Sequence, residues 1–182
     1  MVTQDKKDTM KDLFGSEPIR ALSWKQPFGS LMLHGKIETR KWATKYRGLV
    51  LICCSQKEYT DEQLDSMASI KQVGKIITTL SPLDTWKTFG KAIAIGRLVD
   101  CRPMTIHDED KAFIKFKPAW KEMRKNKDGS VRYVVKRLYC HIYADVRPIK
   151  PFDFKGAQGW RKLTKEVIEK IEILTVNKTE KV

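Results

Sequence analysis

Apolar residues alternate with polar ones, or run together, in several short stretches of the chain, and this pattern predicts β-strands. The stretch GLVLICCSQ (48–56) is apolar at successive positions, as is typical of a strand covered on both faces. KIETRKW (36–42) also suits a strand, which would place Ile37, Thr39 and Lys41 on one face and Glu38, Arg40 and Trp42 on the other. The predicted strands span residues 19–24, 36–42, 48–56, 91–101, 131–135 and 138–149.

Helical signals occupy other stretches. Residues 26–35 place a proline at the first helical position and end at Gly35, which suits a helix stop. The clearest helix is predicted at 60–74, which opens with a capping-box pattern, threonine followed three residues later by glutamine, and closes at Gly74. A last helix is predicted at 164–174, with its apolar residues on one face.

In residues 108–125 the apolar positions follow neither the helical nor the strand period clearly, and a helix up to Pro118 is one interpretation. Asp128-Gly129 is a turn signal between this stretch and the strand at 131–135. Several short strands with a few helices indicate an α+β fold built on a small β-barrel. We expect one domain at 18–175 with an insertion at 111–137, a loose segment at 1–17 and a tail at 176–182.

Positive charge is concentrated in two segments. The chain has 36 Lys and Arg against 22 Asp and Glu, a net charge of +14. Residues 20–48 have a net charge of +6 and residues 111–137 of +8, so the rest of the chain sums to zero. Such an excess predicts a polyanionic partner, nucleic acid first and a membrane surface as the rival. For 111–137 alone, a solvated face is an equal alternative.

The chain shows no apolar run near the roughly 18 residues that a membrane span needs, and its first residues lack an apolar signal-peptide segment. We therefore expect an intracellular, cytoplasmic protein with no membrane partner, with the nucleus as an open alternative. Cys53, Cys54, Cys101 and Cys140 form no CxxC pair, and the three histidines complete no metal-ligand spacing. Buried reduced thiols, no metal and no cofactor are the expectation.

Four blocks of sequence resemble a known family. ALSWKQPFGSLMLHGK, IETRKWATKYRGLVLI, AIGRLVDCRPM and DVRPIKPFDFKGAQGWRKL resemble, in order, the blocks of the ASCH (activating-signal-cointegrator homology) family of the PUA-like superfamily. The resemblance covers about residues 19–163. It implies a PUA-like β-barrel with flanking helices, a cleft beside the first helix, and RNA binding. The cointegrator branch is tied to transcription and DNA, and some small bacterial members are ribonucleases or amidohydrolases acting on acetylcytidine.

One departure from the family pattern concerns GKIETR. This stretch is one residue shorter than the family motif between Gly35 and Glu38, so Lys36 either takes the family lysine's place or points to the other face. The amidohydrolase members use a lysine, a threonine and a glutamate from a later strand. Here Glu38 stands where the threonine would be and the strand at 91–99 has no acid, which disfavours that chemistry. Metal-free RNA cleavage with Lys36 and Glu38 as catalytic residues stays open.

The basic segment around Glu38 offers groups suited to a nucleic acid. Arg40 has the planar fork that grips phosphate, and Glu38 on the same strand face can orient it or accept from a base amine. The alternative is a plain surface ion pair. Aromatic residues nearby could stack unpaired bases, although core packing is the more frequent role of any one tryptophan.

Two further places complete the expected site. The junction of strand and helix at 23–26 offers backbone N–H groups to an anion, and a loop at 155–159 contains glycines that let backbone approach a ligand. The residues expected at the nucleic-acid-binding site are Ser23, Trp24, Lys25, Gln26, Lys36, Glu38, Arg40, Trp42, Tyr46, Arg47, Lys155 and Gln158.

The sequence thus predicts a nucleic-acid-binding module that prefers RNA or single strands. One alternative is a small hydrolase acting on RNA or on a modified nucleoside. Another is a coactivator-like adaptor whose insertion at 111–137 contacts an acidic protein partner.

Overall fold

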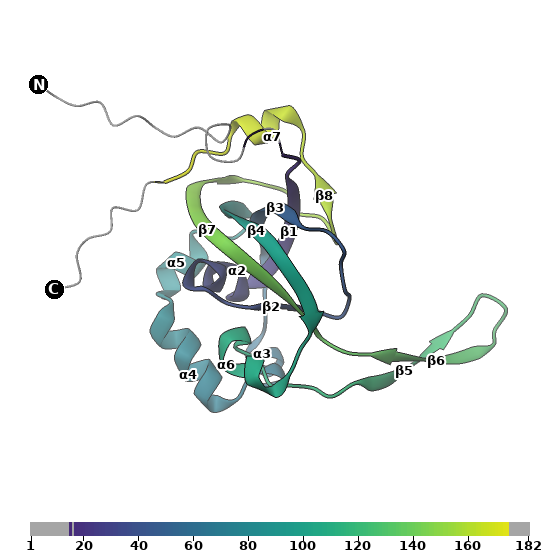
Figure 1. Cartoon of the computed structure of the whole chain (residues 1–182). Helices are drawn as coiled ribbons and strands as arrows, with labels where there is room; N and C mark the ends of the chain where they lie inside the picture. Colours follow the sequence, from purple (N-terminus) through teal and green to yellow (C-terminus); the bar gives the residue numbers. More distant parts are fainter. Residues whose placement is uncertain (1–14, 16, 175–182) are drawn as a thin grey trace, which may run out of the picture.

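A six-stranded mixed sheet is the framework of the molecule (Figure 1). The computed structural model describes Gly15 and residues 17–174. The strand order is β2-β7-β4-β3-β1-β8; β1 and β3 run parallel, and the other neighbours are antiparallel. The strands are β1 (Arg20–Gln26), β2 (Glu38–Arg40), β3 (Gly48–Glu58), β4 (Lys91–Pro103), β7 (Tyr139–Asp153) and β8 (Arg161–Lys162).

The α+β class is confirmed, but within the described residues the sheet is open and does not close into the predicted small β-barrel. The two edge strands, β2 and β8, contain only three and two residues. Such short strands offer too few backbone groups to join the two edges of the sheet. The strand predicted at 36–42 is accordingly reduced to Glu38–Arg40, while β8 was not predicted.

Both faces of the sheet are covered by apolar side chains. Successive residues of β3 belong to two separate cores: Val50, Ile52 and Cys54 lie in one, and Leu51 and Cys53 lie in the other. This two-sided burial confirms the interpretation of 48–56 as a covered strand. Burial raises the pKa of the Cys54 thiol to about 12, as expected for a buried reduced thiol, and no cysteine in the described residues forms a disulfide.

The helical segment after β1 is short and ends where the sequence predicts. It consists of α2 (Phe28–Leu31) and the 3-10 turn η1 (Met32–His34). Gly35 then adopts φ 75°, a left-handed conformation that glycine adopts at little cost. This stop directs the chain into β2.

The helix predicted at 60–74 is two helices, α3 (Asp61–Met67) and α4 (Ile70–Thr79). The predicted capping box at Thr60 is present, but a second capping box at Ser69 starts a new helix. Gly74 therefore lies inside α4 and does not end a helix. A further short helix, α5 (Pro82–Trp86), follows. None of the helices in the described part of the chain is long and apolar enough to cross a membrane.

The insertion at 111–137 forms mainly a β-hairpin. The turn η2 (Ile106–Asp108) and the short helix α6 (Glu109–Ala112) precede it, so the helix considered up to Pro118 stops early. The hairpin strands β5 (Trp120–Lys125) and β6 (Val131–Lys136) flank the predicted Asp128-Gly129 turn and project away from the sheet (Figure 1).

The helix predicted at 164–174 is present only as α7 (Lys165–Glu169). It ends early because the chain returns to the sheet, where Ile173 forms a bridge with Ile149 of β7. The single domain predicted at 18–175 stays a prediction. Apart from Gly15 and Glu17, the segments predicted to be loose, 1–17 and 176–182, lie outside the described residues.

Candidate nucleic-acid interface

Lys36, Glu38 and Arg40 form a cluster of ion pairs at one edge of the sheet. Glu38 Oε2 lies 2.9 Å from Lys36 Nζ, and Glu38 Oε1 lies 2.7 Å from Arg40 Nε. Lys36 also donates to the Ile37 carbonyl at 2.9 Å, and Arg40 Nη2 donates to the Ser23 carbonyl at 2.8 Å. The lone acid of the basic segment therefore neutralises part of the charge of two cations.

The local backbone explains this grouping. After Gly35 the Ile37 amide donates to the Lys111 carbonyl, and β2 then pairs with β7 so that Glu38 faces His141. Strand alternation places residues two apart on one face. Lys36 lies on the face of Glu38, so the shortened GKIETR stretch does not send its side chain to the other side.

The cluster is mostly buried. The Lys36 and Glu38 side chains are 2% and 7% exposed, against 23% for Arg40. Burial lowers the pKa of Lys36, with Glu38 opposing it. Burial alone would raise the pKa of Glu38, but the adjacent Lys36 and Arg40 outweigh it and hold that pKa below its usual value. The cluster is thus not the surface ion pair considered as the alternative, and only Arg40 has appreciable contact with solvent.

Aromatic rings shield the cluster. Lys36 Nζ lies 5.0 Å from the Phe28 ring centre, and Arg40 Cζ lies 5.2 Å from that of Trp24. Tyr59 packs edge-on against Phe28, and Tyr143 packs edge-on against Trp24. Cations over aromatic faces are favourable when desolvated, so these rings stabilise the buried charges.

Four buried polar atoms in and beside the cluster have no hydrogen-bond partner among the described residues: Trp24 Nε1, Arg40 Nε, His141 Nδ1 and the Tyr143 hydroxyl. Of these, Arg40 Nε lies in the ion pair with Glu38. His141 Nε2 lies 3.1 Å from the Trp42 carbonyl, which can only accept, so Nε2 holds the proton and Nδ1 is an acceptor. Burial lowers the pKa of His141, which keeps it neutral. Buried groups of this kind are usually paired, so a water molecule or a polar ligand group suits this position.

A second aromatic group lies outside the cluster. Trp160 packs against Trp42 at 5.7 Å and against Tyr46 at 5.1 Å between ring centres. Tyr46 donates its hydroxyl proton to the Leu49 carbonyl, and Arg20 lies 4.3 Å over its ring. All three residues are half-buried, so each packs against its neighbours and keeps part of its surface exposed.

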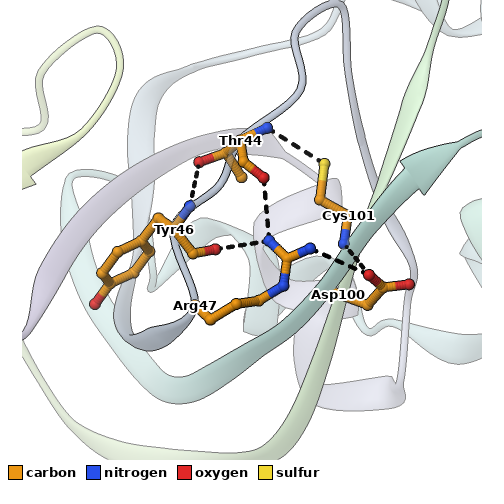
Figure 2. Close-up of polar contacts among 5 residues, drawn as sticks. All are labelled: Thr44, Tyr46, Arg47, Asp100 and Cys101. Atoms are coloured by element: carbon orange, nitrogen blue, oxygen red, sulfur yellow. Dashed lines mark hydrogen bonds and ion pairs between the residues drawn. The ribbon is translucent and has the colours of Figure 1, made fainter.

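Arg47 has a structural position (Figure 2). Its guanidinium donates to the carbonyls of Thr44 and Tyr46 and to Asp100 Oδ1 at 3.1 Å. The Thr44 amide in turn donates to Cys101 Sγ. These bonds fasten the loop after β2 to β4, so Arg47 has fewer donors left for a phosphate than its sequence position suggests.

The strand–helix junction is likewise occupied by the protein itself. The Gln26 side chain is fully buried; its Oε1 accepts from the Ser30 amide and its Nε2 donates to the hydroxyls of Ser30 and Thr88. The Ser30 amide, one of the backbone N–H groups expected to bind an anion, therefore already has a hydrogen-bond acceptor within the protein. Lys25 is half-buried, with Nζ 4.7 Å over the Tyr59 ring. The burial of Gln26 and Trp24 argues against direct phosphate contact by either side chain.

The loop 155–159 lies against β1. A Cβ added to Gly156 would lie 2.2 Å from Ser23 Oγ, so the close backbone approach predicted for this loop is made to Ser23. Lys155 and Gln158 are exposed. The structure therefore places this loop beside the strand that holds Arg40 through the Ser23 carbonyl.

The two basic segments of the sequence meet at one end of the sheet. Arg40 pairs with Tyr139, which also pairs with Pro103, so the loop after β2 and the insertion leave neighbouring strand ends. Lys41 Nζ lies 3.6 Å from Glu122 Oε1 and 5.6 Å from the Trp120 ring centre. Segments 20–48 and 111–137 are thus in direct contact.

Some residues around the cluster were not predicted from the sequence. Tyr59, His141 and Tyr143 reach it only through the pairing of distant strands. Strand alternation in LYCHIYADV does place His141 and Tyr143 on one strand face. This is the one sequence signal that could have predicted that the two side chains lie near each other. No group of three potential metal ligands is present in the described residues.

No family model and no curated protein matches the chain. Among solved structures, the chain is similar to a crystal structure of a mutant ZmASCH protein from Zymomonas mobilis, with a TM-score of 0.47 and 11% identity over 86% of this chain and 100% of that one. That protein bears the name of the family that the sequence blocks resemble. Similarity at this level assigns neither a ligand nor a residue role to this chain.

Proposed function

We propose that the protein binds nucleic acid, with a preference for RNA or single strands, through one cationic surface formed by residues 20–48 and 111–137. The observation that carries the proposal is the contact between these two segments at Lys41 and Glu122. Together the two segments hold the whole net charge of the chain. A polyanion laid across both would release counterions along its length.

The exposed cations of this surface are the ones that contact phosphates. Lys41 and Lys45 lie in the loop after β2, and Arg124 and Arg132 lie on the hairpin, all exposed. Arg40 is the member of the ion-pair cluster with access to solvent, and Glu38 fixes its orientation. This division gives the buried cations a positioning role and leaves phosphate contact to the exposed ones.

The second aromatic group, outside the ion-pair cluster, suits unpaired bases. Trp42, Tyr46 and Trp160 are half-buried, and Trp160 packs against both Trp42 and Tyr46. Base stacking on such side chains contributes about 1–3 kcal/mol per base and tolerates any sequence. A duplex hides the faces of its bases, so this group supports a preference for single strands.

The hydrolase alternative has less support. Both carboxylate oxygens of Glu38 contact cations, and its pKa lies below the usual value. A carboxylate held in this way is a weak proton acceptor at neutral pH. Lys36, the other candidate catalytic residue, is buried and committed to Glu38.

Titration of the protein with a fluorescent single-stranded RNA at several salt concentrations tests the proposal. The affinity should fall with salt with a log–log slope of about −0.7 for each phosphate contact, and several contacts are expected. The double variant Arg124→Ala/Arg132→Ala should make this slope less steep. Lys87→Ala, an exposed lysine outside both segments, is the matched control and should leave it unchanged. Absent binding, or binding insensitive to salt, would refute the proposal.

A further inference from the structure

The hairpin of β5 and β6 is an arm that joins the rest of the molecule at its base. The arm comprises residues 120–136, with six Lys and Arg against two acids. At its base Trp120 lies under Lys41 and Lys117, and its indole donates to Glu122 at 2.9 Å. Beyond that point the arm projects away from the sheet (Figure 1).

The strand register divides the arm into two faces. Residues directly opposite each other in an antiparallel pair share a face, and alternate residues along each strand share it too. Met123 pairs with Tyr133, Lys121 with Val135, and Lys125 with Val131. These six residues form what we call the apolar face of the arm.

The apolar face is open to solvent. Tyr133 is 70% exposed and Met123 is 68% exposed, and Val131 and Val135 are more than half exposed. Lys121 and Lys125 lie diagonally to Tyr133, about 7–8 Å away in such a pair. The arrangement is an aromatic ring on a narrow apolar strip with an ammonium group on either side.

The opposite face contains a like-charged pair. Arg124 lies directly across from Arg132, and both are exposed. Like charges in this position destabilise a hairpin, and a two-stranded hairpin is only marginally stable by itself. A polyanion would relieve this repulsion, so the charge of the arm favours an anionic occupant.

The two faces together select among polyanions. A duplex offers phosphates to the arm but leaves Tyr133 and Met123 without an apolar partner, because its base faces are stacked inside. A single strand offers both phosphates and the flat faces of unpaired bases. An acidic protein would neutralise the charge without a specific need for a ring at position 133, and an anionic lipid surface offers no flat base face on which that ring could stack.

We propose that Tyr133 stacks on an unpaired base of a single-stranded nucleic acid while Lys121 and Lys125 hold the phosphates beside that base. This inference rests on the proposed function and adds the arm as a base-binding part of it. The arm then extends the bound strand beyond the surface around Arg40, so a strand long enough to reach both binds more tightly than a short one.

The test measures the affinities of a 12-nucleotide single strand and of a duplex of equal length for three variants. Tyr133→Val keeps strand propensity and removes the ring, and Tyr133→Phe keeps the ring. Trp86→Val on α5 is the matched control, because Trp86 is 69% exposed and lies on a different element. Tyr133→Val should weaken single-strand binding about 5- to 150-fold, and both other variants should stay within about twofold of wild type.

A fluorescent base analogue in the single strand gives a second readout. Its emission should be quenched by wild type and by Tyr133→Phe but not by Tyr133→Val. Duplex affinity should be the same for all variants.

Equal loss of single-strand and duplex affinity, or no loss in Tyr133→Val, would overturn the stacking role while leaving the proposed function intact. Loss of binding to anionic vesicles alone in Tyr133→Val would assign the ring to a lipid surface and also overturn it. Failure of the wild type to bind either nucleic acid would refute the proposed function itself.

Discussion

Glu38 has a structural role that its position in the sequence does not indicate. Strand alternation correctly predicts that Glu38 and Arg40 share a face, and their ion pair confirms it. The sequence could not predict that Glu38 is buried, because its burial depends on the pairing of β2 with β7, a strand far along the chain. The carboxylate therefore stabilises the fold as well as orienting Arg40.

Glu38→Gln should lower the free energy of unfolding by about 3–5 kcal/mol, since it leaves the Lys36 ammonium buried without its counterion. Urea denaturation followed by tryptophan fluorescence measures the change. Glu122→Gln, at the exposed ion pair with Lys41, is the control and should leave the unfolding midpoint nearly unchanged. Equal stability of Glu38→Gln and wild type would show that the cluster is not held by this charge.

His141 makes stability depend on pH. Burial holds its pKa below the ordinary 6.5, so the unfolded chain takes up the proton at a higher pH than the folded protein. Stability should therefore fall as pH decreases below about 6.5. The melting temperature of wild type should drop more between pH 7 and pH 5 than that of His141→Gln, which has no titrating group at this position. Identical drops would contradict a buried neutral His141.

At the scale of elements, the sequence predicts best where one signal acts alone. The covered strand at 48–56 and the Gly35 stop follow from local patterns and are confirmed. The helix at 60–74 is wrong as one element because Ser69 caps a second helix, and α7 ends early because Ile173 pairs with β7. The apolar periodicity is overridden by a second cap in the first case and by a distant strand in the second.

Gly74→Ala distinguishes a helix that ends at Gly74, as the sequence predicts, from a helix that continues through it, as in the structure. In the structure Gly74 lies inside α4, and an added Cβ meets no atom within 4 Å. Alanine should therefore raise the free energy of unfolding by about 0.5–1 kcal/mol through its better helix propensity. Denaturant titration measures this. A lowered stability would indicate instead that Gly74 ends a helix in a left-handed conformation.

At the scale of the whole molecule, the sequence locates the charge but not its arrangement. The two basic segments can be read directly from the composition of 20–48 and 111–137. Their contact depends on β7, which pairs with β2 on one side and with β4 on the other, so that the loop and the insertion emerge together. Local patterns contain no information on that pairing.

The most direct test compares the salt dependence of single-stranded RNA affinity when each basic segment is neutralised separately and together. Lys41→Ala/Lys45→Ala alters the loop after β2, and Arg124→Ala/Arg132→Ala alters the arm. If one strand spans both segments, each double variant should make the log–log salt slope less steep by about 0.7 for every phosphate that the variant no longer binds, and the combined variant should show the sum of both changes. A slope that responds to only one segment, or to neither, would contradict a single binding surface.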